Sequence, residues 1–184
     1  NSAPVSPYTN YWGGAATNIQ QAINVAASGD EILVAPGVYR LATRIGIPQN
    51  KTLTLRSTES RAAIIDAQRL CEGLFVEGVN SVVEGFTVRN GLTASYGGGI
   101  TLLCAGVVRD CLVTGNQAWG AGGILMQADG AVVENCTVQS NLATYGGGGI
   151  VIYDATAGRV KNCIVRGNIA SNFSGGISLQ GAGS

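Results

Sequence analysis

Apolar and polar residues follow one recurring pattern in the second half of the chain. Ten-residue copies occur four times, as VVEGFTVRNG (82–91), VVRDCLVTGN (107–116), VVENCTVQSN (132–141) and RVKNCIVRGN (159–168). Their central positions, Phe86, Cys111, Cys136 and Cys163, are 25, 25 and 27 residues apart. A fixed period of roughly 20–50 residues is typical of solenoids, in which similar units stack on one another. We therefore predict a stack of similar coils.

The columns of equivalent residues predict two short strands in each copy, with a bend between them. Valine fills two columns that we expect to point inward: Val83, Val108, Val133 and Val160, then Val88, Val113, Val138 and Val165. Between the strands lie residue types that tolerate a left-handed backbone: Gly85, Asp110, Asn135 and Asn162. A second such column, predicted to form a left-handed corner, holds Gly91, Asn116, Asn141 and Asn168. Each copy thus predicts strand, bend, strand and corner.

An aromatic residue, glycines and an isoleucine follow each copy, as in YGGGI and YGGGGI. We expect a third strand to begin at each isoleucine: Ile100, Ile124, Ile150 and Ile177. The glycines lack the lysine and the following helix of a phosphate loop, and also the aspartate of calcium-binding repeats. We interpret them as corners where chain passes close to chain. Three short strands per coil of about 25 residues predict an all-β parallel β-helix with coils about 4.8 Å apart.

The first half of the chain predicts a helical cap and less regular coils. Apolar residues recur at helical spacing from Ile19 to Ala27, Thr17 and Gln20 match a capping box, and Gly29 is placed to end the helix. We therefore expect one domain over 1–184, with a leader (1–15), a capping helix (16–29), early irregular coils (30–81) and regular repeats (82–184). Strands are expected in EILVAPGVY, KTLTLRS and AAIID. The repeats end without a cap, which predicts a truncated array or self-association through the open C-terminal coil.

AATNIQQAINVAASGDEILVAPGVYR, followed by VVEGFTVRNG and repeated GGI coils, resembles the right-handed parallel β-helix repeat proteins. These belong to the pectate-lyase-like superfamily and are common among secreted and surface proteins of bacteria. The resemblance runs from about residue 10 to the end. It implies a right-handed β-helix and an extracellular or cell-surface location. It leaves the activity open, because one fold can host lyases, hydrolases and adhesins.

Composition excludes several classes of function. The chain has no histidine, which removes Ser-His-Asp catalysis and histidine-based metal sites. Eleven basic residues balance eleven acidic ones without a basic run, so we expect no nucleic-acid partner. Apolar stretches are too short for a membrane span, and five cysteines without a C-x-x-C pair exclude a zinc ribbon. We expect no metal and no cofactor, apart from calcium if the chain is a lyase.

The superfamily resemblance implies a cleft on the outer face of the third strand. The outward residues there are uncharged: Thr101, Leu103, Leu125, Gln127, Val151, Tyr153, Ser178 and Gln180. A pectate lyase would need acidic ligands and a basic residue at this place, and a polygalacturonase several aspartates and a histidine. The weak catalytic candidates are Asp66, Arg69, Glu72 and Glu77, which also fit scattered surface charge. We therefore predict a non-catalytic scaffold or stalk, with a polysaccharide lyase or glycoside hydrolase as the alternative.

Two further columns have structural interpretations. Glu84, Arg109, Glu134 and Lys161 alternate in sign along the stack, which favours pairing between neighbouring coils. The inward cysteines Cys111, Cys136 and Cys163 are expected to fill the core as thiols, with a disulfide between neighbours as the alternative.

An aromatic column is the candidate binding feature. Tyr96, Trp119, Tyr145 and Phe173 precede the glycine corners, and Tyr153 ends a neighbouring strand. Their rings are predicted either to contact a polysaccharide or cell-surface glycan, or to stack on one another. Both interpretations remain open from the sequence.

Overall fold

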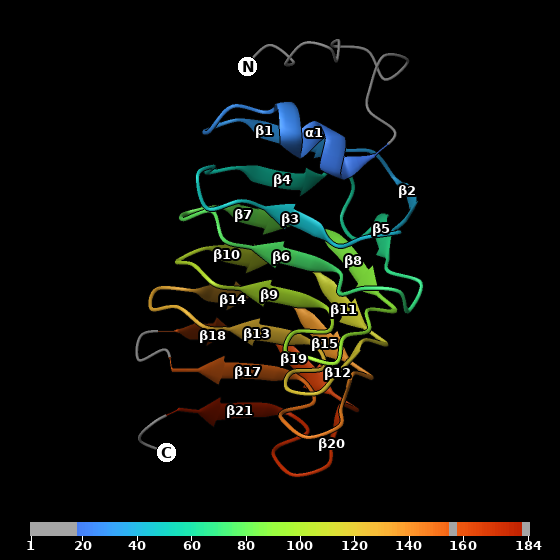
Figure 1. Cartoon of the computed structure of the whole chain (residues 1–184), viewed down its shortest axis with the longest axis vertical. Coiled ribbons are helices and arrows are strands. Elements are labelled where there is room, and N and C mark those ends of the chain that lie inside the picture. The colour runs from blue at the N-terminus through green and yellow to red at the C-terminus, as the bar shows by residue number, and fades with distance from the viewer. Residues whose placement is uncertain (1–17, 155–157, 182–184) are drawn as a thin grey trace.

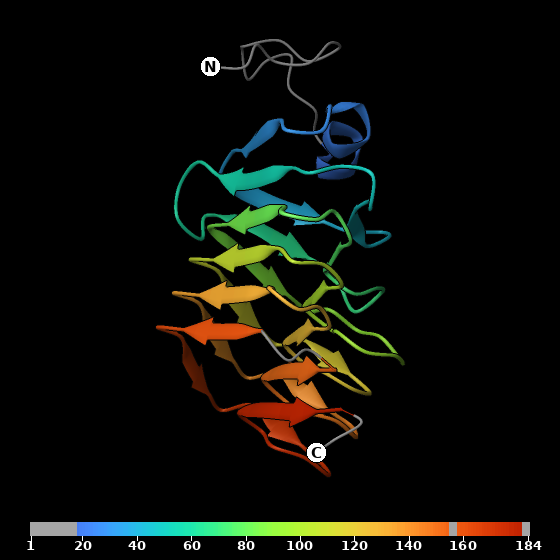
Figure 2. The ribbon, with the colours of Figure 1, turned by 90° about the vertical axis from the view of Figure 1, so that its left-hand side faces the viewer.

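The computed structural model describes residues 18–154 and 158–181 as a stack of β-coils (Figure 1). The described chain runs along the stack, from the short helix at one end to the last strand at the other (Figures 1 and 2). The predicted leader (1–15) and Thr17 lie outside the described residues.

Three long parallel sheets form the walls of the stack. The first sheet contains β1 (Glu31–Val34), β4 (Thr54–Ser57), β7 (Val82–Glu84), β10 (Val107–Arg109), β14 (Val132–Glu134) and β18 (Arg159–Lys161). The second contains β2 (Gly37–Arg40), β5 (Ala63–Asp66), β8 (Phe86–Arg89), β11 (Leu112–Thr114), β15 (Thr137–Gln139) and β19 (Ile164–Arg166). The third contains β3 (Ile45–Ile47), β6 (Leu74–Val76), β9 (Ile100–Leu102), β13 (Ile124–Met126), β17 (Ile150–Tyr153) and β21 (Ile177–Gln180). Each strand pairs with the equivalent strand of the next coil, which confirms the predicted parallel β-helix.

The register follows the sequence repeat. Val108 lies opposite Val83 and Val133, and Val113 opposite Val88 and Val138. The early strands pair in the same way, because β4 lies between β1 and β7 and β5 lies between β2 and β8. The inward columns fill one continuous apolar core that runs through the coils. The prediction of inward valine columns is confirmed.

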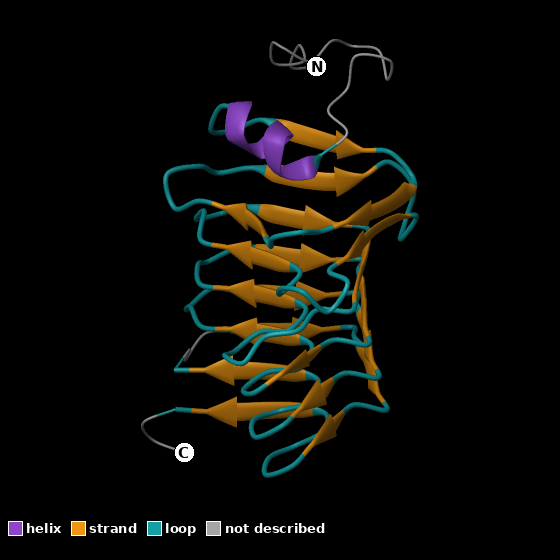
Figure 3. Ribbon diagram, turned by 45° about the vertical axis from the view of Figure 1, so that its right-hand side comes forward, coloured by secondary structure: helices purple, strands orange, loops and turns teal. Residues whose placement is uncertain are grey.

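A short helix covers the N-terminal end of the core, as predicted. This helix, α1 (Ile19–Val25), lies beside β1 and β3, and Ile19 and Ile23 are buried (Figure 3). It is shorter than the predicted 16–29, and its N-cap is Asn18, whose side chain accepts a hydrogen bond from the Gln20 backbone N–H. It ends at Ala26, before Gly29, which adopts a positive φ in the following turn. No helix in the described part of the chain is long and apolar enough to cross a membrane.

The bend between the first two strands of each coil is left-handed, as predicted. Gly85, Asp110, Asn135 and Asn162 all have φ between 50° and 75°. Arg61 ties this column together, because its Nε donates to the Asp110 carbonyl (3.2 Å) and its Nη2 to the Asn135 carbonyl (3.3 Å). One side chain therefore connects its own coil to bends on two later coils.

The predicted left-handed corner at Gly91, Asn116, Asn141 and Asn168 is wrong by one residue. The positive φ lies one position earlier, at Asn90, Gly115, Ser140 and Gly167. The asparagines instead turn inward and form an asparagine ladder, in which Asn116 Nδ2 donates to Asn141 Oδ1 (3.0 Å) and Asn141 Nδ2 to Asn168 Oδ1 (2.9 Å). The corner therefore combines a residue of positive φ with a buried amide one position later in the regular repeats.

A fourth, small sheet follows the asparagine ladder and was not predicted. It consists of β12 (Gln117–Ala118), β16 (Leu142–Ala143) and β20 (Ile169–Ala170). The signal for it was the N-x-A triplet in NQA, NLA and NIA, whose alanines at 118 and 143 are buried. The small sheet begins the segments that we call the glycine loops, residues 92–99, 117–123, 142–149 and 169–176.

The glycines in these loops allow one coil to approach the next, as predicted. A Cβ added at Gly123 would lie 2.5 Å from the Gly149 carbonyl oxygen of the next coil and 2.8 Å from Val138 Cγ1. No real side chain fits that space, so the position requires glycine. The glycine loops project to one side of the strands in the C-terminal half of the stack (Figure 3).

Candidate functional site

The glycine loops bring the predicted aromatic residues together into one continuous row. We call Tyr96, Trp119, Tyr145 and Phe173 the aromatic row. Trp119 and Tyr145 are parallel, with ring centroids 4.7 Å apart and an interplanar angle of 1°. Tyr96 meets Trp119 edge-on at 5.3 Å, and Phe173 meets Tyr145 edge-on at 5.7 Å. The predicted stacking of the rings is present, and each ring still exposes more than a third of its surface.

Tyr153 contacts the Tyr96 ring, although it lies two coils beyond Tyr96. The centroids of these two rings are 5.9 Å apart. The Tyr96 ring occupies the place where a Cβ on residue 120 would lie, so Gly120 makes room for it. All five predicted carbohydrate-contacting residues therefore belong to one aromatic group.

Contacts within the row cover part of each ring. Parallel stacking covers one face of Trp119 with Tyr145, and the edge contact with Tyr96 adds a second neighbour. Each ring in an aromatic pair prefers such offset or edge-to-face geometry, because the ring edge is electropositive and the face electronegative. No hydrogen bond joins the Trp119 indole N–H or the hydroxyls of Tyr96, Tyr145 and Tyr153 to another described residue. These polar groups are open to water or to a ligand.

The outer face of the third sheet differs from the expected open cleft. Thr101, Leu125, Val151 and Ser178 point outward from the sheet, but all four are buried. Leu125 and Val151 form a second apolar cluster with Ala121 of a glycine loop, and Tyr153 packs against it. The glycine loops therefore cover this column, and only the outer column with Leu103 and Gln127 is exposed. Thr101 Oγ1 is buried there without a hydrogen-bond partner among the described residues.

The four weak catalytic candidates each have their own neighbours. Asp66 is bound on both carboxylate oxygens, by Arg89 (2.9 Å to Oδ2) and by Asn90 Nδ2 (2.9 Å to Oδ1). Burial would raise the pKa of Asp66, but these hydrogen bonds and one from the Gln68 backbone N–H lower it below its ordinary value. Arg69 donates to Gln117 Oε1 at 3.2 Å. Asp66 thus joins its coil to the next one, and Arg69 reaches the coil after that.

Glu72 is buried to about the same degree as Asp66. Burial raises its pKa, and the Arg44 guanidinium, 3.0 Å from Oε1, opposes that rise. Arg44 also lies over the Phe75 ring at 3.8 Å, a cation–π contact that fixes its direction. Glu77 lies near Cys104. Burial raises the pKa of the Cys104 thiol to about 11, and the negative charge of Glu77 makes a smaller contribution.

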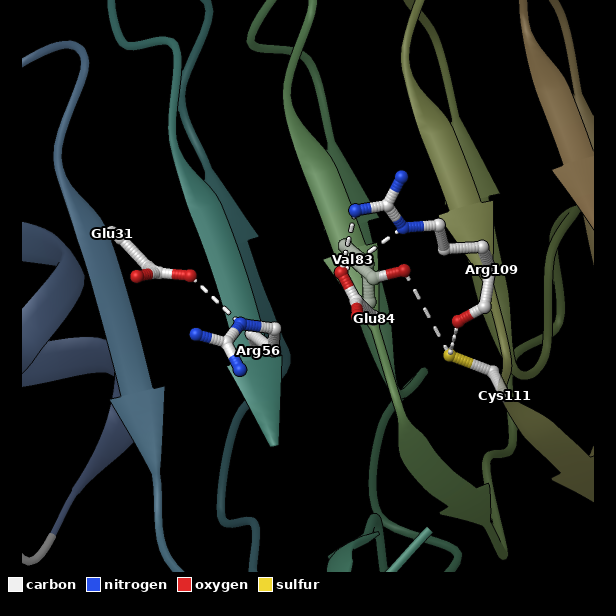
Figure 4. A network of polar contacts seen from close by, with 6 residues as sticks. All are labelled: Glu31, Arg56, Val83, Glu84, Arg109 and Cys111. Carbon is white, nitrogen blue, oxygen red and sulfur yellow. Dashed lines mark hydrogen bonds and ion pairs between the residues drawn. The ribbon is translucent and has the colours of Figure 1, made fainter. Parts of the chain in front are cut away.

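The charge column on the first sheet forms ion pairs as predicted. Arg109 Nη2 lies 2.7 Å from Glu84 Oε2, and Lys161 Nζ lies 3.1 Å from Glu134 Oε2. A further pair, Arg56 with Glu31, extends the column toward the N-terminus (Figure 4). We call these three pairs the charge ladder. Because each acid is matched by a cation on an adjacent coil, the ladder contributes to register.

The inward cysteines are unpaired thiols. Cys111 and Cys136 are buried in the core, and each sulfur donates to backbone carbonyls, as Cys111 does to Arg109 and Val83 (Figure 4). A hydrogen bond with Cys111 and burial raise the pKa of Cys136 to about 12. A thiol with so high a pKa is a poor nucleophile at neutral pH. Within 18–154 and 158–181, no group of three histidine, cysteine or acidic side chains is placed to hold a metal.

A comparison with protein families agrees with the observed fold. The family described as the right-handed β-helix region matches residues 67–184, which include β6 and every later strand. No curated protein and no solved structure matches the chain. Since the matched range covers well over half of the sequence, this chain belongs to the right-handed β-helix family.

Proposed function

We propose that this chain is a rigid, non-catalytic β-helix segment that acts as a scaffold or stalk and displays the aromatic row along one side. The observation that carries the proposal is the unbroken register of the three long sheets. Each sheet joins six strands, so parallel hydrogen bonding connects the first coil to the last. A structure of this kind holds surface groups at fixed separations along its axis.

The arrangement of charge also favours a scaffold over the alternative, a polysaccharide lyase or glycoside hydrolase. Two carboxyl groups that act together must converge on one substrate bond. Here Asp66 is bound by Arg89 and Asn90, and Glu72 by Arg44. Both acids therefore have structural partners. By resemblance to secreted and surface β-helix proteins, we place the chain outside the cell or on its surface.

The test is a search for turnover of neutral and acidic polysaccharides, with and without calcium. New reducing ends and the ultraviolet absorbance of unsaturated products would be measured for the wild type, Asp66→Asn and Glu72→Gln. A scaffold releases neither product above the rate in buffer. Product release by the wild type that is lost in either variant would overturn the proposal in favour of an enzyme.

A further inference from the structure

The aromatic row combines exposed rings with polar groups that the protein itself does not use. Trp119 and Tyr145 are 39% and 42% exposed. The hydroxyls of Tyr96, Tyr145 and Tyr153 and the indole N–H of Trp119 have no hydrogen-bond partner among the described residues. By contrast, the Tyr39 hydroxyl donates to the Ala35 carbonyl at 2.9 Å. The row therefore combines exposed aromatic rings with neutral hydrogen-bond donors.

The chain around the row carries no charge over long stretches. Residues 90–108, 111–128, 135–153 and 167–184 contain no aspartate, glutamate, lysine or arginine. Arg69 donates to Gln117 at the start of one glycine loop, and Asp154 follows Tyr153, so charges of both signs border these stretches. An acidic polymer would lose hydration along the uncharged stretches, which themselves offer it no cationic partner.

We propose that the aromatic row binds a neutral, hydroxyl-rich polymer, of the neutral polysaccharide class, through its exposed rings and its phenol and indole groups. The proposal rests on the rigid scaffold proposed above, which keeps the rings at a fixed spacing. The hydroxyl oxygens of such a polymer accept hydrogen bonds from the phenol and indole groups and also meet the electropositive ring edges. Because Trp119 and Tyr145 cover each other's faces, a sugar ring does not stack on the contacting faces.

The test is affinity electrophoresis through native gels that contain a soluble neutral β-glucan or polygalacturonate. The gels would be run above the isoelectric point of about 6.4, so that the protein migrates as an anion. Wild type would be compared with Tyr145→Phe, which removes one hydroxyl and keeps the ring, and with Trp119→Ala, which breaks the stack. Leu33→Ala is the control, because Leu33 is equally exposed but lies on the first sheet.

We expect the neutral glucan alone to retard the wild type and the control. Tyr145→Phe should bind about fivefold more weakly, the size of one lost hydrogen bond, with an unchanged unfolding midpoint. Trp119→Ala should lose most of the retardation. The Tyr145→Phe result separates recognition from folding, because its ring remains in place.

Several results would overturn this inference. They are no retardation of the wild type by the neutral polymer, equal retardation by polygalacturonate, and equal retardation of wild type and Tyr145→Phe. Binding to phosphatidylcholine vesicles in place of glucan would assign the row to an apolar surface. None of these results bears on the scaffold proposal, which fails only if the wild type releases product from a polysaccharide.

Discussion

Single residues in this protein act mainly on their neighbours in adjacent coils. Asp66 is an example, because it links its own coil to Arg89 and Asn90 of the next. Burial would raise its pKa, yet the hydrogen bonds that it accepts lower the pKa below its ordinary value of 3.8. An acid whose pKa is lower in the folded chain adds stability above the unfolded pKa. That stability is lost as the pH falls through the folded value.

Replacing Asp66 with asparagine should therefore have a pH-dependent cost. We expect Asp66→Asn to lower the free energy of unfolding by about 2 kcal/mol near neutral pH, the usual size for hydrogen bonds to a charged group. The difference should shrink as the pH falls below about 4, where the carboxyl of the unfolded chain begins to protonate, and should disappear below the lower pKa of the folded state. Urea unfolding at a series of pH values measures it. Glu59→Gln, at an exposed site, is the control. A cost that stays constant down to strongly acidic pH would contradict this account.

Residue types alone predicted some positions and misplaced others. The left-handed bends at Asp110 and Asn135 were predictable, because few side chains tolerate that backbone. The role of Asn141 was not, because asparagine serves equally as a left-handed residue and as a buried amide. Which of the two roles Asn141 takes depends on its contacts with Asn116 and Asn168 in the neighbouring coils. The local sequence pattern does not describe these contacts. The alignment of the aromatic rings along the stack was predictable from the repeat. The burial of Leu125 and Val151 beneath the glycine loops was not.

At the scale of elements, the asparagine ladder joins the second sheet to the small sheet. Asn141 Oδ1 accepts from the backbone N–H and Nδ2 of Asn116, both at 3.0 Å, and its Nδ2 donates to the Val113 carbonyl (3.1 Å) and Asn168. Asn141 is 1% exposed. Loss of this amide leaves one or two buried polar groups without a partner, and such groups are costly in a region of low polarity.

We therefore expect Asn141→Ala to destabilise the chain by about 3 kcal/mol, from one to two buried groups left unsatisfied. Gln127→Ala, at an exposed site on the preceding coil, should change the stability by less than about 0.5 kcal/mol. Denaturant unfolding followed by circular dichroism compares the two. Equal effects would show that the ladder adds nothing beyond ordinary packing.

For the molecule as a whole, the two ends of the stack differ. Helix α1 covers the N-terminal end, whereas apolar residues of the last described coil remain exposed: Ile164, Ile169, Ile177 and Leu179. Leu179 lies opposite Ile152 of the preceding coil. Ile152 is buried, whereas Leu179 is 71% exposed. Exposed strand edges with apolar side chains favour association with other strands.

The 184-residue chain should therefore self-associate through this end. Multi-angle light scattering should give a mass that rises with protein concentration for the wild type. Leu179→Lys places a charge at the edge and should shift the mass toward the monomer. Leu33→Lys, which adds the same charge to the outer face of β1, should leave the mass unchanged. A wild type that is monomeric at every concentration would contradict the prediction.

The stacked register also has a consequence for the gene. Most contacts join one coil only to the next. Duplication of a 25-codon unit would therefore lengthen the protein and preserve the strand pairing between neighbouring coils. Deletion of a coil is less well tolerated where contacts join coils that are not adjacent. Arg61 reaches Asn135 across two intervening coils, and Tyr96 reaches Tyr153 across one. Recombination that deleted the coil of β10 to β13, which lies between both pairs, would break both contacts, so length variants should more often arise outside residues 61–153.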